Sequence, residues 1–214
     1  MTVNDKQQNK SKPRRKNEEA ILTAAEEVFA ELGFAGATTS LIAQRAGIPK
    51  ANLHYYFPTK EALYRTVTSR IFTIWLEAAK TFDDCDDPAD ALSRYIRAKM
   101  NISFKYPLGS KVWAQEIMHG APQIQDFLDQ TLKSWTASRV IIIERWIAEG
   151  KINPVAPNYL LYMIWATTQH YADYAHQIAT LNDGRPLSDE QMEVAQQTVI
   201  NIILRGIGLS SEEP

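Results

Sequence analysis

The sequence predicts an all-α protein. Apolar residues recur at the three- and four-residue spacing of amphipathic helices along most of the chain. The segments with this spacing end at glycine, at proline or in short polar turns. No two segments show the alternation of a β-hairpin, and no internal repeat stands out. With 214 residues and 45% hydrophobic side chains, the chain can bury a full core as one large domain or two smaller ones.

Glycine and proline set most of the predicted helix boundaries. Gly33 stops the first helix, and Gly47 supplies the left-handed turn after the second. Pro49 precedes the third helix and Pro58 ends it. The longest early pattern, from Lys60, predicts a helix that joins two domains. We predict about nine helices, over residues 17–32, 39–46, 50–57, 60–79, 88–105, 107–119, 122–149, 157–181 and 188–206.

Positive charge is concentrated at the N-terminus. Residues 1–60 carry 9 Lys or Arg and 6 Asp or Glu, whereas residues 61–214 carry 14 and 19. Six cations lie between Lys6 and Lys16 with no acid among them, which fits either a solvated tail or an arm that contacts phosphates. We predict a disordered basic arm over 1–16, an N-terminal three-helix domain over 17–62 and a C-terminal helical domain over 63–214.

A cytoplasmic protein without a membrane anchor is expected. The single Cys85 has no second cysteine with which to form an internal disulfide. The first residues, MTVNDKQQNKSK, lack the apolar run of a signal peptide or a bilayer span.

Residues 38–57, TTSLIAQRAGIPKANLHYYF, have the form of a helix-turn-helix. The small side chain of Ala43 allows the two helices to cross closely, and Gly47 makes the turn between them. Apolar side chains are expected to bury the inner faces of both helices, namely Ile42, Ile48, Leu53 and Phe57.

The side chains left on the outside of the third helix are polar, small or aromatic. Such a face fits the major groove of DNA, where amide and ammonium groups pair with base edges and small or aromatic groups touch thymine methyls. Alternatively, two short helices around a glycine belong to an ordinary helical core, in which Tyr55 and Tyr56 pack against the first helix. The candidate DNA contacts are Lys50, Ala51, Asn52, His54, Tyr55 and Tyr56, with Lys60 as a candidate phosphate contact.

This region resembles the DNA-binding signature of the TetR/AcrR family of bacterial transcriptional regulators. The resemblance implies an all-α homodimer with a divergent C-terminal domain for ligand binding and dimerisation, and by position it assigns DNA contacts to the candidates above. Family members usually have a Thr or Ser cap where this chain has Ala37, so Thr38 or Thr39 is expected to cap the second helix and donate to phosphate. The resemblance lies in Gly33-Phe34, Ile42-Ala43, Ala46-Gly47-Ile48, Leu53, Tyr55-Tyr56-Phe57 and Lys60-Glu61-Ala62-Leu63.

Two segments are similar to the pyrimidine-utilisation regulators within this family. They are the run from Met163 to Asp173 and the segment from Asn52 to Tyr64. The similarity implies that a pyrimidine base such as uracil or thymine is the effector and releases the protein from DNA. It extends more loosely through Trp75-Leu76, Tyr95-Ile96-Arg97 and Gly120-Ala121-Pro122.

A pocket for a planar base needs aromatic walls together with fixed donors and acceptors. The amide of Gln169 can accept from a ring N–H and donate to the neighbouring carbonyl, and Trp165 lies one turn earlier on the same face. Lys99 can donate to a second carbonyl, although a lysine near Arg97 also fits a solvated face. The candidate effector-binding residues are Trp75, Lys99, Trp113, Trp165, Gln169 and Tyr171; alternatively, the aromatic residues only build the core.

Metal binding, cofactors and catalysis are not expected. His170, Asp173 and His176 are spaced three residues apart and make half of a metal site at most, because no matching cluster of ligands is found elsewhere. The four histidines form no set with a nucleophile, and the chain has no glycine-rich phosphate loop.

The expected mechanism depends on distance. A dimer has to place its two recognition helices roughly 34–36 Å apart to bind both halves of a palindromic double-stranded DNA operator. A ligand among the C-terminal helices can shift the fourth helix and change that distance. Helices 157–181 and 188–206 are the candidate dimer interface, with Leu160, Leu161, Ile164, Thr168, Val199, Ile203 and Ile207, unless these side chains only close the core of one chain.

Two functional hypotheses follow. The first is a transcriptional regulator, acting as a repressor, that a small effector controls. The second is an architectural or partner-recruiting DNA-binding protein without an effector, whose C-terminal domain serves only assembly.

Overall fold

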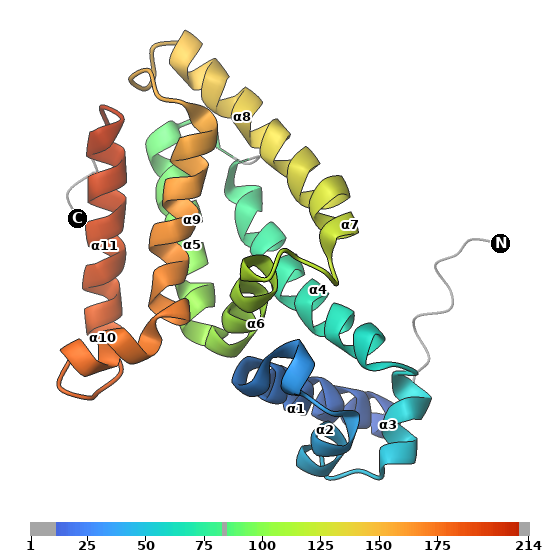
Figure 1. The fold of residues 1–214 in the computed structure, drawn as a ribbon. Helices are drawn as coiled ribbons and strands as arrows, with labels where there is room; N and C mark the ends of the chain where they lie inside the picture. Colours follow the sequence, from blue (N-terminus) through green and yellow to red (C-terminus); the bar gives the residue numbers. More distant parts are fainter. Residues whose placement is uncertain (1–11, 83–84, 210–214) are drawn as a thin grey trace.

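The computed structural model describes residues 12–82 and 85–209, and the regular structure in these residues is entirely helical, as predicted (Figure 1). The helices are α1 (Lys12–Gly36), α2 (Thr39–Arg45), α3 (Lys50–Tyr56), α4 (Lys60–Ala78), α5 (Pro88–Lys105), α6 (Pro107–Met118), α7 (Gln125–Phe127), α8 (Lys133–Ala148), α9 (Pro157–Asp173), α10 (Ala175–Leu181) and α11 (Asp189–Gly206). The first three helices gather with the start of α4 at one end of the molecule, and the remaining helices form the C-terminal part (Figure 1).

The first helix begins earlier than predicted. Residues 12–16, which were assigned to a disordered arm, belong to α1, and the rest of that arm, residues 1–11, lies outside the described residues. The predicted stop at Gly33 is confirmed, because its φ of 67° is not helical, although helical residues continue on the far side to Gly36. Basic side chains therefore project from the first turns of a helix.

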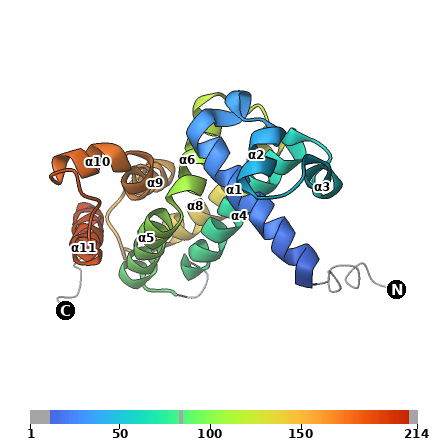
Figure 2. The same cartoon turned by 90° about the horizontal axis from the view of Figure 1, so that it is seen from below.

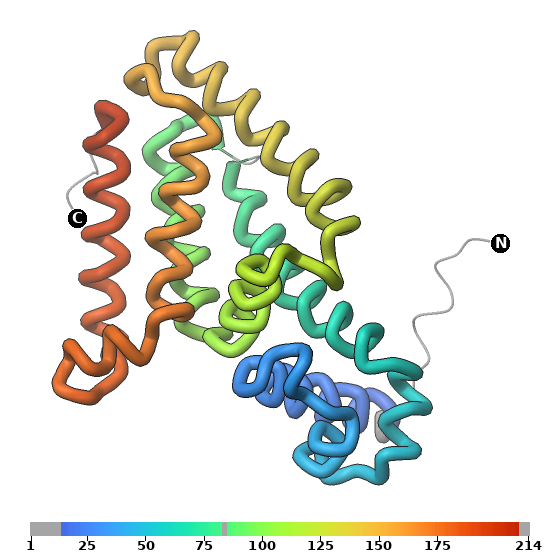
Figure 3. Tube along the Cα trace, viewed as in Figure 1, coloured from blue at the N-terminus to red at the C-terminus, as the bar shows by residue number. Residues whose placement is uncertain are grey.

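Helix α4 joins the two parts of the molecule as an unbroken rod (Figure 3). Its first half packs Leu63 and Val67 into the N-terminal core, and its second half packs Ile71 and Trp75 into a separate cluster that includes Trp113 of α6. A 3₁₀ turn, η2 (Ala79–Phe82), follows it and enters the main C-terminal core. The predicted helix from Lys60 is thus confirmed, and its two halves pack into different clusters.

Two predicted helices are interrupted. The segment 122–149 contains α7, a π-helical turn η3 (Leu128–Leu132) and α8. The segment 157–181 breaks at Tyr174, where φ −114° and ψ 27° leave the helical region, and α10 then turns across the end of the bundle (Figure 2). No side chain of α10 is fully buried, so no core packing supports a continuous helix through this segment.

The apolar stripe predicted for the dimer interface is instead the core of a single chain. Leu160, Leu161, Ile164, Val199, Ile203 and Ile207 all belong to the largest buried cluster, and Thr168 is completely buried. They are covered because α9 and α11 both pack against α5. The same two helices expose other apolar side chains, namely Tyr159, Met163, Val194 and Ile202. Across the described residues, no helix is both long and apolar enough to cross a membrane.

Candidate DNA-binding face and effector cavity

The helix-turn-helix forms as its residue types require. Ile42 and Leu53 are fully buried between α2 and α3, and Ala43 is buried where the helices cross. Gly47 adopts a φ of 67° in the turn, and the N–H of Ile48 donates to the carbonyl oxygen of Ala43 at 3.1 Å. A side chain at Gly47 would strain this turn, because a positive φ is unfavourable for residues with a Cβ.

The outer face of α3 is open to solvent. Lys50, Ala51 and Asn52 are exposed, and Tyr55 has 70% of its surface accessible. Tyr56 is half-buried and accepts a hydrogen bond from the side chain of Asn17 on α1 at 3.5 Å. Tyr56 is therefore partly covered by the first helix, as the alternative expected, whereas Tyr55 stays largely open to solvent.

Helix α1 brings its basic first turns to this face. The guanidinium of Arg14 lies 5.6 Å from the centre of the Tyr55 ring, in a cation–π arrangement. Nearby, the His54 ring makes its Nδ1 contact with the carbonyl oxygen of Pro58 at 3.3 Å, so Nδ1 carries the proton of that hydrogen bond. The face thus combines a cation, aromatic rings and an amide within two helices.

Two predicted phosphate contacts have structural partners. Thr38, not Thr39, is the N-cap of α2, and its side-chain oxygen accepts from the N–H of Leu41 at 3.1 Å. Lys60 donates to the carbonyl oxygens of Phe34 and Ala37 at 2.8 and 3.1 Å, and its ammonium lies over the Phe34 ring. Its ammonium therefore links the start of α4 to the last turn of α1 and to the residue that follows it.

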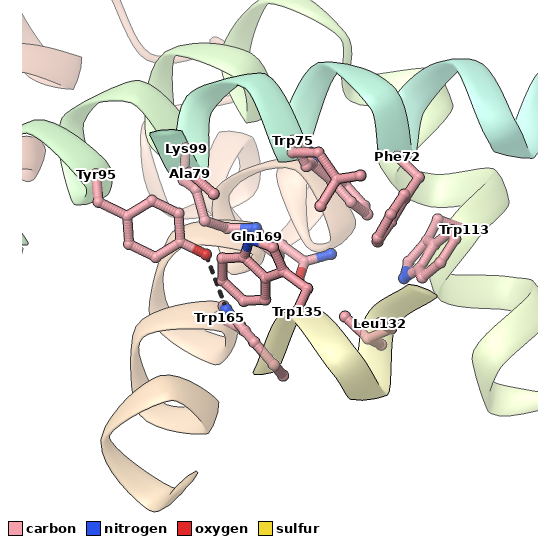
Figure 4. Close-up of a pocket in the computed structure, with 11 residues that line it drawn as sticks. Phe72, Trp75, Ala79, Tyr95, Lys99, Trp113, Leu132, Trp135, Trp165 and Gln169 are labelled. Atoms are coloured by element: carbon pink, nitrogen blue, oxygen red, sulfur yellow. Dashed lines mark hydrogen bonds between the residues drawn. The ribbon is translucent and has the colours of Figure 1, made fainter. Parts of the chain in front are cut away.

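A cavity of about 70 Å³ lies among α4, α5, α6, α8 and α9 (Figure 4). Five of the six predicted effector-binding residues line it: Trp75, Lys99, Trp113, Trp165 and Gln169. These residues are far apart in the sequence and come from four helices. By the same measure a single water needs about 10–15 Å³, so the cavity has room for several waters or for a small ring.

Lys99 is the main electrostatic feature of the cavity. It is only 3% exposed, which corrects the alternative that it lies on a solvated face. Burial lowers the pKa of its amine to about 7, against the opposing effect of the Asp173 carboxylate. Its Nζ lies 4.7 Å from the centre of the Trp75 ring and makes no hydrogen bond to the described residues. Near neutral pH this amine gains or loses its proton easily.

The polar side chains around Lys99 differ in whether they have partners. The Nε1–H of Trp165 donates to the hydroxyl of Tyr95 at 3.0 Å (Figure 4). The Nε1–H of Trp75 is buried without an acceptor in the described part of the chain. The half-buried amide of Gln169 also makes no hydrogen bond there. The cavity therefore offers several donors and one amide oxygen that a ligand can use.

Sequence reasoning missed part of the cavity wall and misplaced one residue. Tyr171 does not line the cavity and packs against the main C-terminal core instead. Tyr95 was part of the loose family similarity, but nothing in the sequence links it to Trp135. The lining residues that were not predicted are Phe72, Leu76, Ala79, Tyr95, Leu132 and Trp135.

The histidine-containing segment of α9 and α10 has other contacts. His170 stacks on Tyr174 with ring centres 4.7 Å apart, and Asp173 accepts a hydrogen bond from Ser110. Within residues 12–82 and 85–209, no three His, Cys, Asp or Glu side chains are grouped so that they could hold a metal ion.

Two family models cover nearly the whole chain. Residues 21–67 match the bacterial regulatory proteins of the tetR family, and residues 68–210 match the C-terminal region of YcdC-like protein. The chain belongs to the TetR family. In this TetR-family protein the two matches meet inside α4, close to the predicted domain boundary at residues 62 and 63.

Its relatives are transcriptional regulators. The HTH-type transcriptional regulator RutR of Escherichia coli (strain K12) is 42% identical over 191 residues, which cover 88% of this chain and 89% of RutR. The transcriptional repressor NicS of Pseudomonas putida is 27% identical, with 87% of this chain and 90% of NicS covered. A putative regulator from Streptomyces coelicolor, SCO4942, has the same fold with a TM-score of 0.71, 23% identity, and coverage of 90% of this chain and 98% of that one. The TetR-family chain is thus a DNA-binding transcriptional regulator of the helix-turn-helix type.

Proposed function

We propose that this regulator is a repressor that a small planar effector releases from its operator, and that the effector is a pyrimidine base such as uracil or thymine. The observation that carries the proposal is the cavity, where the Lys99 amine and the Gln169 amide lie between aromatic rings without hydrogen-bond partners in the described residues. Buried polar groups usually have such partners, so a ligand is the natural source of the missing ones.

The chemistry of a pyrimidine dione complements this cavity. A ring N–H between two carbonyls can donate to the Gln169 oxygen, while one of the carbonyls accepts from its NH₂ group. Lys99 can donate to the second carbonyl, and the rings of Trp75 and Trp165 can cover the faces of the base. The similarity to RutR supports this assignment.

On the DNA side, the exposed outer face of α3 supports contact with a major groove. We propose that Thr38 and Thr39 contact phosphate at the start of α2, with Arg14 as an added cation. Lys60 is proposed to position α4 rather than to hold a phosphate, because its ammonium already donates to two carbonyls. The proposed groove contacts are Lys50, Ala51, Asn52, His54, Tyr55 and Tyr56.

We propose a homodimer through α9 and α11, but through residues other than those first predicted. Tyr159, Met163, Val194 and Ile202 are 48–72% exposed on these helices. Apolar side chains grouped on a surface typically mark a protein interface. Light scattering on the full chain tests this, and a shift of Ile202→Lys from dimer to monomer is expected.

Thermal melting of the full chain tests the effector. Uracil or thymine is expected to raise the melting temperature of the wild type but not of Gln169→Ala, since a ligand present at about 100 times its Kd adds about 2.7 kcal/mol. Gln177→Ala, at an exposed glutamine on α10, is the matched control and should respond like the wild type. If a broad panel of nucleobases leaves the wild type unchanged, the effector-independent DNA-binding hypothesis replaces this one.

A further inference from the structure

The first turns of α6 touch both functional parts of the molecule. Helix α6 lies between α1 and the C-terminal helices (Figures 1 and 2). Val112 is 1% exposed and belongs to the N-terminal core, whereas its neighbour Trp113 lines the effector cavity. A movement of this segment therefore reaches both sites.

One end of a polar chain lies at the cavity. The hydroxyl of Ser110, which is fully buried, donates to Asp173 Oδ1 at 2.8 Å. Asp173 is the last residue of α9, and the charge of its carboxylate favours the protonated form of Lys99 against the effect of burial. Ser110 thus fixes the carboxylate that balances the buried lysine of the cavity.

The other end lies in the DNA-binding part. The side chain of Glu26 on α1 lies against Gly109 in the first turn of α6, where the backbone N–H groups have no partner within the helix. Arg70 of α4 places a positive charge near the same carboxylate. A Cβ on Gly109 would lie 2.9 Å from Glu26 Oε1 and 3.1 Å from Ile71 Cδ1, so a larger residue would have to displace the Glu26 carboxylate from this turn.

We propose that Gly109 and Ser110 couple the effector cavity to the DNA-binding part, with Ser110 as the positioning residue that links Asp173 and Lys99 to α1. The inference rests on the proposed effector function and specifies how binding in the cavity is transmitted to the DNA-binding part. It adds a route through α6 to the movement of α4, which packs into the apolar clusters of both parts.

The physical basis is competition for Lys99. A carbonyl that accepts from the Lys99 amine changes the attraction between that amine and Asp173, and Asp173 in turn changes its hold on Ser110. A displacement of the first turn of α6 moves Glu26, which lies against Gly109. It also moves Val112, which lies one turn further along α6 in the N-terminal core. Close packing passes a small displacement on instead of absorbing it.

A double-mutant cycle tests the coupling without DNA or effector. Hydrogen–deuterium exchange of α1 amides is measured in the full-length wild type, Lys99→Met, Ser110→Ala and the double variant. Lys99→Met is expected to speed exchange around Glu26 by about threefold or more, and by less than about 1.5-fold when Ser110 is already alanine. Ser103→Ala removes another buried hydroxyl, one that has no partner, and should leave α1 within about 1.5-fold of the wild type.

The proposal is wrong if Lys99→Met leaves α1 exchange unchanged, or if the effects of the two substitutions simply multiply. Should Ser110→Ala fail to fold, Asp173→Asn takes its place in the cycle, since it keeps a hydrogen-bond acceptor and removes the charge. Failure of every base to raise the melting temperature would remove the pyrimidine assignment but would not alter this cycle, so the two claims fail separately.

Discussion

The DNA-binding face and the effector cavity are built in opposite ways. The face on α3 comes from one short stretch of chain, and most of its side chains are exposed to solvent. The cavity draws Trp75, Lys99, Trp113 and Gln169 from four helices and buries all of them but Gln169, which is half-buried. The face on α3 can exchange its bound water for DNA directly. The cavity instead acts through side chains whose properties burial has altered.

This difference explains where sensitivity to a small molecule arises. An exposed lysine such as Lys50 is surrounded by water and has no contact with the described residues of the C-terminal part. Burial lowers the pKa of Lys99 to about 7, so near neutral pH its charge depends on its neighbours. A ligand of a few atoms can therefore affect Lys99 strongly, and DNA binding changes only through the contacts between the two regions.

The largest expected effect is a loss of stability in the N-terminal core that leaves the effector cavity intact. Leu53 is fully buried in the N-terminal core, so Leu53→Ala should cost about 2–5 kcal/mol of unfolding free energy and abolish operator binding. The cavity lies outside that core, so the variant should still respond to the effector in thermal melting. Urea denaturation and a gel shift measure the loss, and a variant that still binds DNA normally would contradict the packing described for α3.

A substitution on the exposed face should act on DNA alone. Tyr55→Ala is expected to weaken operator binding by about 1–3 kcal/mol, or roughly 5- to 150-fold, by removing a contact in the groove. Because Tyr55 is 70% exposed, the melting temperature should barely change. Ile141→Ala, at a 65% exposed residue on α8, is the control in fluorescence anisotropy with labelled operator. Equal affinities for the two variants would remove Tyr55 from the interface.

The same contrast decides how much the sequence could predict. The turn at Gly47 and the burial of Leu53 depend on residues close together in the chain, and both predictions were confirmed. The cavity was predicted in part, because Trp165 and Gln169 lie one turn apart on one helix. Trp135 and Tyr95 join them only through the packing of α5, α8 and α9, for which a single sequence carries no local signal.

The errors have the same origin. Periodicity showed correctly that Leu160 and Ile203 lie on apolar faces, but it does not say whether the same chain or a second one covers them. The depth of Lys99 was left open because Arg97 lies only two residues before it. In the structure Arg97 is exposed and Lys99 is buried, since helical positions two apart point in different directions.

Burial of Lys99 should make stability depend on pH. In the unfolded chain the amine keeps its proton up to its ordinary pKa of 10.5, but in the folded chain it loses it near 7. The unfolded state therefore binds more protons between these values, and stability rises with pH by up to about 1.4 kcal/mol per unit. Urea denaturation from pH 7 to 9.5 should show this slope in the wild type and lose it in Lys99→Met.

Two neighbouring groups bear on this measurement. Burial raises the pKa of the Asp173 carboxyl from its ordinary value of 3.8, which lies on the acid side of the pH range of this experiment. Burial also raises the pKa of the Tyr95 hydroxyl, so it stays protonated throughout the window. A slope that persists unchanged in Lys99→Met would assign the effect to another group and remove the argument that the cavity perturbs its lysine.

The smallest expected effect lies at the start of the helix-turn-helix. Thr38→Ala removes the side-chain oxygen that accepts from Leu41 and should cost about 1 kcal/mol of stability, while Thr38→Ser should keep most of it. If Thr38 also donates to phosphate, Thr38→Ala should weaken operator binding even at a temperature where the variant remains fully folded. Anisotropy titrations at that temperature, compared with melting curves, separate the cap from the contact. A purely structural Thr38 would change the melting temperature and leave the operator affinity as it is.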